Sequence, residues 1–494
     1  MKIIFNYFVF TVLLFQYNSV LCQNATWYVV RGNISTDDSW GIDVDTNGDI
    51  YWTTVHKNPP PYGFYDIYLY KFSDSGNQIW ISSPFGAQFN DVCFPVKVSG
   101  NYVYTAGRTD LNIWQTDTDP LVLCYDKVSG NIVWGNVYAP SPNYGYEEID
   151  GLSIQPDGIY FTAWSRGQGA NDMNILIQKL SLTGQLIWSN TYDFNGLNKH
   201  DGANGHLVID DNYIYVAAHV NKASLLSNDG DAALICFSRA DGSYQWHSIW
   251  GGNSWDHGLG LTMSSDSILY MVGHTGSYGS VQQFFINKYQ RDGQLLWSRL
   301  WGGPGAELAR AVVCDGDSII YAAGTTTSYG NGDNEIFVLK YNSNGVLLDS
   351  LFWGGHKKEQ TRDMAINNGY LYITGYTESF HYTQGDTASD ALLLKINGRT
   401  MQAPDTIAIA NIVMLDNKEQ KLFIYPNPIS DIIYIENIST NKKKKYQIFN
   451  SIGQLAKEGF VYSNQIGTTD LTNGFYFIRV TTDKEYYFGK FVKE

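Results

Sequence analysis

Residues 256–303 read DHGLGLTMSSDSILYMVGHTGSYGSVQQFFINKYQRDGQLLWSRLWGG and contain four short strand-like runs separated by turns. The first run, Gly258 to Met263, is small and rich in glycine, and the fourth contains Trp297. Ser-Asp, Gly-Ser and Asp-Gly clusters lie between the runs, which is the usual chemistry of turns. The stretch therefore predicts a four-stranded unit whose first strand lies in a crowded place at the centre of the fold.

The same pattern occurs seven times along the chain. Each copy is marked by a tyrosine in an apolar run after a polar turn, at intervals of 51 to 56 residues: Tyr51, Tyr104, Tyr160, Tyr215, Tyr270, Tyr321 and Tyr372. A tryptophan follows each of the first five markers, at Trp80, Trp134, Trp188, Trp246 and Trp297. Repeats near 50 residues with several short apolar runs are typical of propeller blades. No stretch after residue 22 keeps a helical period, so helix should be scarce.

The seventh repeat lacks a fourth strand of its own. Nine residues after Lys395, where this strand would carry its tryptophan, the chain has Pro404 in a stretch without strand character. Residues 25–32 (ATWYVVRG) resemble a fourth strand that has no partners before it, and Trp27 lies 53 residues before Trp80. A strand shared between the two ends would remove an open sheet edge. We therefore expect an all-β fold, a seven-bladed β-propeller closed by an N-terminal strand.

Three segments of the repeats resemble the SBBP-type bacterial propeller repeat. They are Asp-x-x-Gly-Asp-Ile-Tyr ending at Tyr51, Tyr-x-x-Gly at Tyr270, Tyr321 and Tyr372, and Trp-Gly-Gly at Trp250, Trp301 and Trp353. The resemblance covers roughly residues 25–400 and implies the fold. It carries no activity over, because members of that family share none.

The N-terminal segment has the composition of a secretory signal. Lys2 precedes an apolar core in residues 1–22, which is too short and too interrupted to span a membrane. Cleavage after Cys22 would leave Gln23 first, and a lipoprotein interpretation of Cys22 is weaker because Leu21 stands where a small residue is preferred. We expect four regions: a signal peptide at 1–22, the propeller at 23–400, a linker at 401–420 and a C-terminal domain at 421–494.

The C-terminal domain reads as about seven short strands. Its hallmarks are Tyr425-Pro426-Asn427-Pro428, Asp431, Ile448-Phe449-Asn450-x-x-Gly453, Asp470-Leu471, Gly474 to Val480 and the final Lys490-Phe491-Val492-Lys493. They closely resemble the type A (Por) sorting domain of the type IX secretion system of Bacteroidota, which implies a small immunoglobulin-like β-sandwich. The resemblance further implies export, contact with the type IX machinery, and removal or anchoring of this domain at the cell surface. We interpret the run Lys442 to Lys445 as a solvated loop.

The net charge limits the possible binding partners, and the cysteines limit the possible disulfides and metal sites. The formal net charge of −15 favours solubility and argues against nucleic acid or anionic lipid as a partner. After signal removal four cysteines remain, Cys93, Cys124, Cys236 and Cys314. Their predicted positions on the strands allow no good disulfide, and their spacing matches no zinc motif. The protein is therefore expected to be stable without disulfides.

Candidate binding residues lie four positions after each marker tyrosine, where the second strand reaches one face of the ring. These positions differ between repeats, whereas frame positions are alike: Val55, Arg108, Trp164, His219, His274, Thr325 and Tyr376. The loops beyond them add Trp114 and Trp255. We select as the binding set Arg108, Trp114, Trp164, His219, Trp255, His274 and Tyr376, because aromatic groups with polar neighbours suit stacking on sugars or gripping a protein loop. The alternative is that these side chains simply cover the bases of the loops.

Two acidic patterns are further candidates. Asp43, Asp45, Asn47 and Asp49 fit the first half of a calcium loop, but the twelfth position is Thr54, so a simple turn is the favoured interpretation. Acidic residues also start several innermost strands: Asp38, Asp91, Asp150, Asp201 and Asp256, with Arg310 and Arg362 near the equivalent place in the last two repeats. They either ring the mouth of the channel or hold backbone amides.

Two classes of function remain open. No Gly-x-Ser-x-Gly, His-Glu-x-x-His, P-loop or dinucleotide motif is present, which favours a non-catalytic binding or adhesion protein for glycan or protein at the cell surface. The alternative is a propeller enzyme, namely a quinoprotein-like oxidoreductase, a lyase or a glycan hydrolase. Segments such as Asp126 to Trp134 resemble quinoprotein repeats, although no adjacent cysteine pair accompanies them.

Overall fold

A computed structural model describes residues 26–493 apart from 34, 59–62, 87–89, 111–117, 139–145, 167–172, 195–199, 204, 223–228, 331–332, 383–387, 405–419, 422, 426–428, 437–443, 451–454, 462–464 and 482–485. The expected signal segment and Trp114 lie outside these residues. The described part is built from strands and contains no helix, as the sequence predicted. It accordingly holds no helix long and apolar enough to cross a membrane.

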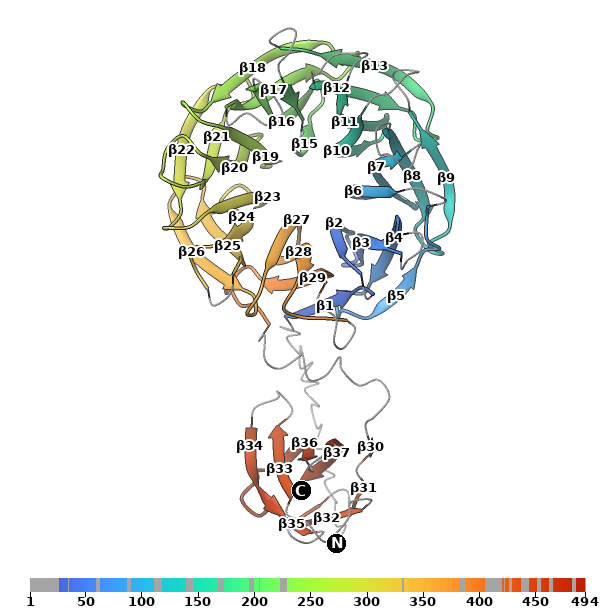
Figure 1. The fold of residues 1–494 in the computed structure, drawn as a ribbon, viewed down its shortest axis with the longest axis vertical. Coiled ribbons are helices and arrows are strands. Elements are labelled where there is room, and N and C mark those ends of the chain that lie inside the picture. Colours follow the sequence, from blue (N-terminus) through green and yellow to red (C-terminus); the bar gives the residue numbers. More distant parts are fainter. Residues whose placement is uncertain are drawn as a thin grey trace, which may run out of the picture.

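The sheets of residues 27–397 stand side by side around a ring (Figure 1). The first three repeats contain β2 (Asp37–Val44), β3 (Ile50–Lys57), β4 (Tyr65–Phe72), β5 (Gln78–Ile81), β6 (Asp91–Ser99), β7 (Tyr102–Asp110), β8 (Thr118–Asp126), β9 (Ile132–Val137), β10 (Glu147–Gln155), β11 (Gly158–Arg166), β12 (Met173–Leu180) and β13 (Leu186–Tyr192). The fourth and fifth contain β14 (His200–Gly202), β15 (Leu207–Ile209), β16 (Tyr213–Lys222), β17 (Asp231–Ser238), β18 (Tyr244–Trp250), β19 (Asp256–Met263), β20 (Leu269–Thr275), β21 (Gln283–Tyr289) and β22 (Leu295–Trp301). The last two contain β23 (Glu307–Asp315), β24 (Ile319–Thr326), β25 (Glu335–Asn342), β26 (Leu347–Trp353), β27 (Glu359–Asn367), β28 (Tyr370–Thr377) and β29 (Asp390–Asn397), and β1 (Trp27–Arg31) joins β29.

One row of side chains keeps the same register from repeat to repeat. The marker tyrosine lies opposite a lysine or cysteine of the third strand, which lies opposite the tryptophan of the fourth, as in Tyr270, Lys288 and Trp297. The equivalent rows are Tyr51–Lys71–Trp80, Tyr104–Cys124–Trp134, Tyr160–Lys179–Trp188 and Tyr215–Cys236–Trp246. In these five repeats the tyrosine and tryptophan ring centroids lie 6.1 to 6.2 Å apart. The sequence repeat is therefore a repeat of packing.

The seventh repeat completes its row with the N-terminal strand. β1 pairs antiparallel with β29, so that Trp27 lies opposite Lys395, which in turn lies opposite Tyr372. This pairing is the one that the sequence predicted for residues 25–32. None of the described sheets closes on itself, so closure of the ring depends on contacts between sheets.

The contact between neighbouring sheets also repeats. The tryptophan of one repeat packs on the glycine in the last turn of the next, and a Cβ on Gly293 would lie 2.7 Å from Trp246. The same arrangement puts Gly76 on Trp27, Gly130 on Trp80, Gly184 on Trp134, Gly242 on Trp188 and Gly345 on Trp297. All six glycines have φ between 72° and 87°, which a side chain would strain. The pair of Gly76 and Trp27 joins the last repeat to the first by this same contact.

A β-bulge interrupts the innermost strand of six repeats. The residues left without a partner are Trp40, Phe94 with Pro95, Asp150, Leu259, Arg310 and Arg362. In the fourth repeat the innermost strand is split into β14 and β15. A bulge leaves its extra residue unpaired and re-aims the side chain, and it tolerates proline because no ladder hydrogen bond is lost.

The innermost strands are as crowded as the sequence predicted. A Cβ on Gly41 would lie 2.1 Å from the carbonyl oxygen of Phe94 in the next repeat, and one on Gly205 would lie 2.4 Å from that of Leu259. Backbone atoms cannot yield to such contacts, so only glycine fits at these two positions.

The C-terminal strands form two further sheets around their own core. These strands are β30 (Gln420–Lys421), β31 (Phe423–Tyr425), β32 (Ile432–Glu436), β33 (Lys444–Asn450), β34 (Leu455–Val461), β35 (Gln465–Gly467), β36 (Gly474–Thr481) and β37 (Tyr486–Lys493). Ile433, Ile466 and Ile478 come from both sheets and share one buried cluster. β30 pairs parallel with β37, whereas the other strand pairs of these two sheets are antiparallel.

Predictions for the linker and for the lysine run of the C-terminal domain need correction. Met401 and Pro404 were assigned to a linker, but Met401 is buried in the core of the ring and the Pro404 carbonyl accepts a hydrogen bond of 3.1 Å from the Trp353 indole. Lys444 was assigned to a solvated loop, but it starts β33 and is buried, which lowers the pKa of its ammonium group. Lys445 also belongs to β33, where it pairs with Glu458 at 2.9 Å.

A glycine substitution should measure how much the contact between sheets contributes. Gly293→Ala would strain the positive φ and push a methyl group into Trp246, whereas Gly316→Ala would strain a similar φ of 64° in open space. We expect Gly316→Ala to cost about 1 kcal/mol of unfolding free energy and Gly293→Ala to cost about 1–3 kcal/mol more. Chemical denaturation of both variants measures the loss of unfolding free energy in each. Equal losses would show that Trp246 can move aside and that the contact between sheets is not tightly packed.

Candidate functional site

The diverse positions expected at one face of the ring lie near the ends of the second strands. Trp164 is opposite Glu148, His274 is opposite His257, and Tyr376 is opposite Gln360 of the innermost strands. Side chains opposite each other in antiparallel strands point to the same face of the sheet. The predicted set and these innermost residues therefore form one layer around the channel.

This layer is more buried than the sequence suggested. His219 is 2% exposed and His274 is 6% exposed, while Arg108, Trp164 and Tyr376 are partly buried. The two histidines are covered by the adjoining repeats, so almost none of their surface is open to a ligand. Of the predicted set, Trp164, His219, Trp255 and His274 are brought together, whereas Arg108 and Tyr376 lie in separate clusters.

Two tryptophans and three histidines form a continuous chain of ring contacts across the third, fourth and fifth repeats. Trp164 meets His219 with ring centroids 5.6 Å apart, and His219 stacks on His257 at 4.5 Å. Trp255 lies 4.7 Å from His257 and 4.8 Å from His274. Burial, followed by the charge of Arg310, lowers the pKa of His274 to about 3, so this imidazole is neutral.

Sequence reasoning missed His257. The signal that could have found it is strand alternation: His257 is the residue opposite the candidate position His274, just as Glu148 is opposite Trp164. Both were overlooked because the innermost strands were examined for their acidic first residues alone.

Arg108 belongs to a charged cluster between the second and third repeats. Its guanidinium forms an ion pair of 2.5 Å with Glu148 and lies 5.1 Å from the ring centroid of Tyr146. The Tyr146 hydroxyl donates to the same Glu148 carboxylate at 2.5 Å. Arg108 is therefore held between repeats, and only part of it remains available to a ligand.

The bulged residues line a cavity at the centre of the ring. Its volume is about 50 Å³, and every repeat contributes to its wall: Trp40, Phe94, Asp150, His206, Leu259, Arg310 and Arg362. Arg362 donates to Asp38 at 2.7 Å and lies 3.7 Å from the ring centroid of Trp40. It also lies 5.5 Å from the ring centroid of Tyr376, which connects this cavity to the predicted layer.

Two buried charges of the cavity have perturbed acidity. Burial and the nearby charge of Glu148 raise the pKa of Asp150 well above its usual value, against the attraction of Arg310. The Trp164 indole N–H lies near this carboxyl group and favours its ionised form, although the two do not reach full hydrogen-bond geometry. Burial and the charge of Arg362 lower the pKa of Arg310 to about 10.

The acidic residues at the starts of innermost strands divide into two groups. Asp38 and Asp150 face the channel, as described above. Asp256 instead accepts hydrogen bonds from the Gly252 amide at 3.0 Å and the Ser277 hydroxyl at 2.7 Å, which fixes the preceding loop. Asp201 likewise accepts from the Phe194 amide at 2.7 Å.

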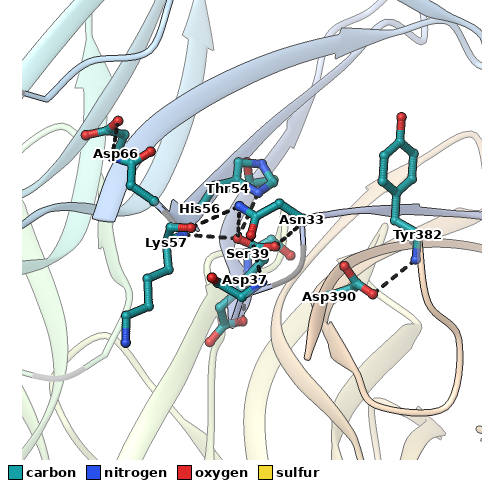
Figure 2. Close-up of polar contacts among 12 residues, drawn as sticks. Asn33, Asp37, Ser39, Thr54, His56, Lys57, Asp66, Tyr382 and Asp390 are labelled. Carbon is teal, nitrogen blue, oxygen red and sulfur yellow. Dashed lines mark hydrogen bonds and ion pairs between the residues drawn. The ribbon is translucent and has the colours of Figure 1, made fainter. Parts of the chain in front are cut away.

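Between the last and first repeats, Asp37 at the start of β2 lies near Asp390 at the start of β29 (Figure 2). Asp37 accepts from the Lys57 amide and pairs with His56, both at 3.1 Å, and Asp390 accepts from the Tyr382 amide at 3.0 Å. A Cβ on Gly32 would lie 1.8 Å from Asp390 and 2.7 Å from Asp37, so both carboxylates border the same point. Burial, partly offset by the Tyr382 amide and His381 and reinforced by the charge of Asp37, raises the pKa of Asp390 to about 6.

The candidate calcium loop has its carboxylates engaged elsewhere. Asp45 accepts from the Asn47 and Asp49 amides and pairs with Lys127 at 2.7 Å, while Asp49 pairs with Lys71 at 2.8 Å. Asp43 accepts from the Val98 amide at 2.8 Å. Across the described residues, no group of three or more histidine, cysteine or acidic side chains is placed to hold a metal ion.

The four cysteines within the described residues form no disulfide. All four are free, and burial raises the pKa of each to about 12.

Comparison with known proteins identifies the C-terminal domain. Residues 423–494 match the family model of the secretion system C-terminal sorting domain. The chain therefore carries a type IX sorting domain, which implies export followed by secretion or attachment at the cell surface. A search of curated proteins finds no match.

Two propeller-like solved structures resemble the ring at the level of shape. Extracellular domains 1–2 of Drosophila semaphorin 1b are 10% identical with a TM-score of 0.42, over 75% of this chain and 86% of that one. Quinohemoprotein alcohol dehydrogenase from Comamonas testosteroni is 9% identical with a TM-score of 0.41, over 77% of each chain. Likeness at this level carries no argument about function.

The pair of acids between the last and first repeats predicts a pH dependence. Because the pKa of Asp390 is higher in the folded protein than in the unfolded chain, its contribution to stability is complete below about pH 4 and is lost as the pH rises through about 6. Asn at this position cannot ionise and can donate to Asp37. We expect the melting temperature of Asp390→Asn to rise relative to wild type between pH 4 and pH 7, and that of the exposed control Asp333→Asn to follow wild type. Parallel profiles for all three proteins would contradict this account.

Proposed function

We propose that the protein acts outside the cell as a non-catalytic binding protein for a glycan or protein ligand. The channel mouth is its binding site, and the C-terminal domain engages the type IX machinery. The observation that carries this proposal is the central cavity, to which every repeat contributes at least one side chain and whose wall combines aromatic, aliphatic, acidic and basic groups. Conserving the frame while varying this ring of positions is how a repeat scaffold presents a specific surface.

In this proposal the ring is a seven-bladed propeller built of SBBP-type repeats and closed by β1. The register of Trp27 with Lys395 supports it, as does the contact of Trp27 with Gly76 that the other repeats also make. Residues 1–22 serve as a signal peptide, and the source belongs to the Bacteroidota, as the resemblance of the sorting domain implies.

Arg108, Trp164 and Tyr376 are the ligand contacts that the structure supports best, because all three keep part of their surface open. His219 and His274 are buried and act by holding Trp164 and Trp255 in place. Partly exposed aromatic faces beside charged groups suit both sugar rings and protein loops.

Binding can be tested by changes at the mouth and on the opposite face. Trp164→Ala and Tyr376→Ala should each lower the affinity for the array ligands that the wild-type protein binds. We expect a loss of about tenfold or more, as follows the loss of a central aromatic contact. Tyr213→Ala removes an exposed tyrosine at the other end of a second strand and should leave capture unchanged.

The probes are a printed glycan array and the extracellular polymer fraction of the host, with melting temperature as the folding control. A wild-type protein that binds neither probe, or folded mouth variants that bind as wild type does, would contradict the proposed role.

Sorting can be tested with a chain that ends after Pro404. This boundary keeps Met401 and the hydrogen bond to Trp353, so the ring should melt as it does in the full chain. In the native host the truncated protein should stay inside the outer membrane, because residues 423–494 are missing. Adding these residues back should restore surface delivery. Recovery of the truncated protein at the surface would refute a sorting role for this domain.

A further inference from the structure

Arg310 is a partly buried cation that forms no ion pair among the described residues, although Asp150 and Asp38 attract it at longer range. It projects from the bulge of β23 into the central cavity, and among the described residues no ion pair or hydrogen bond engages its guanidinium group. Its pKa of about 10 keeps it charged at neutral pH. A charge that no ion pair engages in such a place is costly to the fold, which is the usual mark of a group kept for binding.

The neighbouring acids are already engaged by other partners. Asp38 accepts from Arg362 at 2.7 Å. Asp363 accepts from the Met364 amide at 2.7 Å and lies 3.4 Å from His206. Neither of these carboxylates forms an ion pair with Arg310.

Asp150 is the remaining carboxyl group in the wall of the cavity. Burial and the charge of Glu148, itself paired with Arg108, favour the protonated form of Asp150, as its raised pKa shows. A protonated carboxyl group donates through its hydroxyl. The cavity therefore presents a cation that no ion pair engages, beside a carboxyl group whose raised pKa favours the neutral form, and this combination suits an anion.

The size of the cavity limits what can enter. A water molecule needs about 10–15 Å³ of such space, so about 50 Å³ admits three or four non-hydrogen atoms. A carboxylate group fits this volume and a sugar ring does not. The planar guanidinium group of arginine also matches the two oxygens of a carboxylate.

We propose that this cavity binds the carboxylate of an acidic glycan unit such as a uronic acid, with Arg310 as its counter-ion. The sugar ring lies outside the constriction, against the partly exposed Trp164 and Tyr376. This inference rests on the binding role proposed above and names the ligand class for the same site.

The charge of the protein favours a glycan over an acidic peptide. With a net charge of −15, the surface repels a ligand that carries many adjacent charges. At physiological salt this repulsion is screened beyond about 8 Å, so a carboxylate that enters the channel feels mainly the cavity. A short oligosaccharide with one carboxylate per ring meets these conditions best.

Calorimetric titration of the full chain with a galacturonic acid trimer and with its methyl ester tests the inference. The acid should bind at least tenfold more tightly than the ester, which has the same rings without charge. Arg310→Gln should remove this preference, and Arg310→Lys should keep part of it. Arg291→Gln changes an exposed arginine that pairs with Asp210 outside the cavity, and it should behave as wild type.

The other outcomes separate this inference from the proposed function. If the ester binds as well as the acid, or folded Arg310→Gln keeps the preference, the carboxylate site is refuted while glycan binding at the mouth stands. If a glutamate-rich peptide binds through Arg310 and the trimer does not, the acidic glycan is the wrong class. If wild type binds neither the trimer nor any array glycan or protein, both proposals fail.

Discussion

The packing of one tryptophan on the last-turn glycine of the next repeat is the contact on which the ring depends. A single four-stranded sheet has two apolar faces and cannot bury either alone, so each repeat needs neighbours. Trp297 and Lys288 both donate to the Ser343 carbonyl, and Trp27 and Lys395 both donate to the Asp74 carbonyl. The junction of the chain's two ends thus reproduces an ordinary junction between repeats.

The bulges separate the frame from the channel. Regular alternation would send every second residue of an innermost strand between the sheets, where apolar groups are required. One extra residue per strand escapes this requirement, so Trp40, Asp150 and Arg310 can differ in size and charge while the frame stays constant. The bulges also direct these residues into a shared cavity, where placing charged groups away from water destabilises the fold.

The periodicity of the sequence predicted those features of the fold that are set within one strand or by the spacing of the repeats. The marker tyrosines, the tryptophan rows and the pairing of residues 25–32 with the last repeat all followed from spacing. The bulges did not, because a register shift leaves no mark on composition. The burial of His219 and His274 was missed because it depends on the adjoining repeat, which a single repeat does not reveal. Met401 was misassigned for the same reason, since its partners lie in other strands.

The pairing of β1 with β29 determines when the ring can finish folding. Its two strands are separated by almost the whole of the repeat region, so the final sheet forms only after the rest of that region is available. Closing so long a loop is slow, although its entropic cost grows only with the logarithm of length. If the chain emerges N-terminus first during export, Trp27 appears early and waits for its partner, with its strand edge open to other chains. The exported chain therefore has a defined interval of vulnerability, which ends when residues 390–397 arrive.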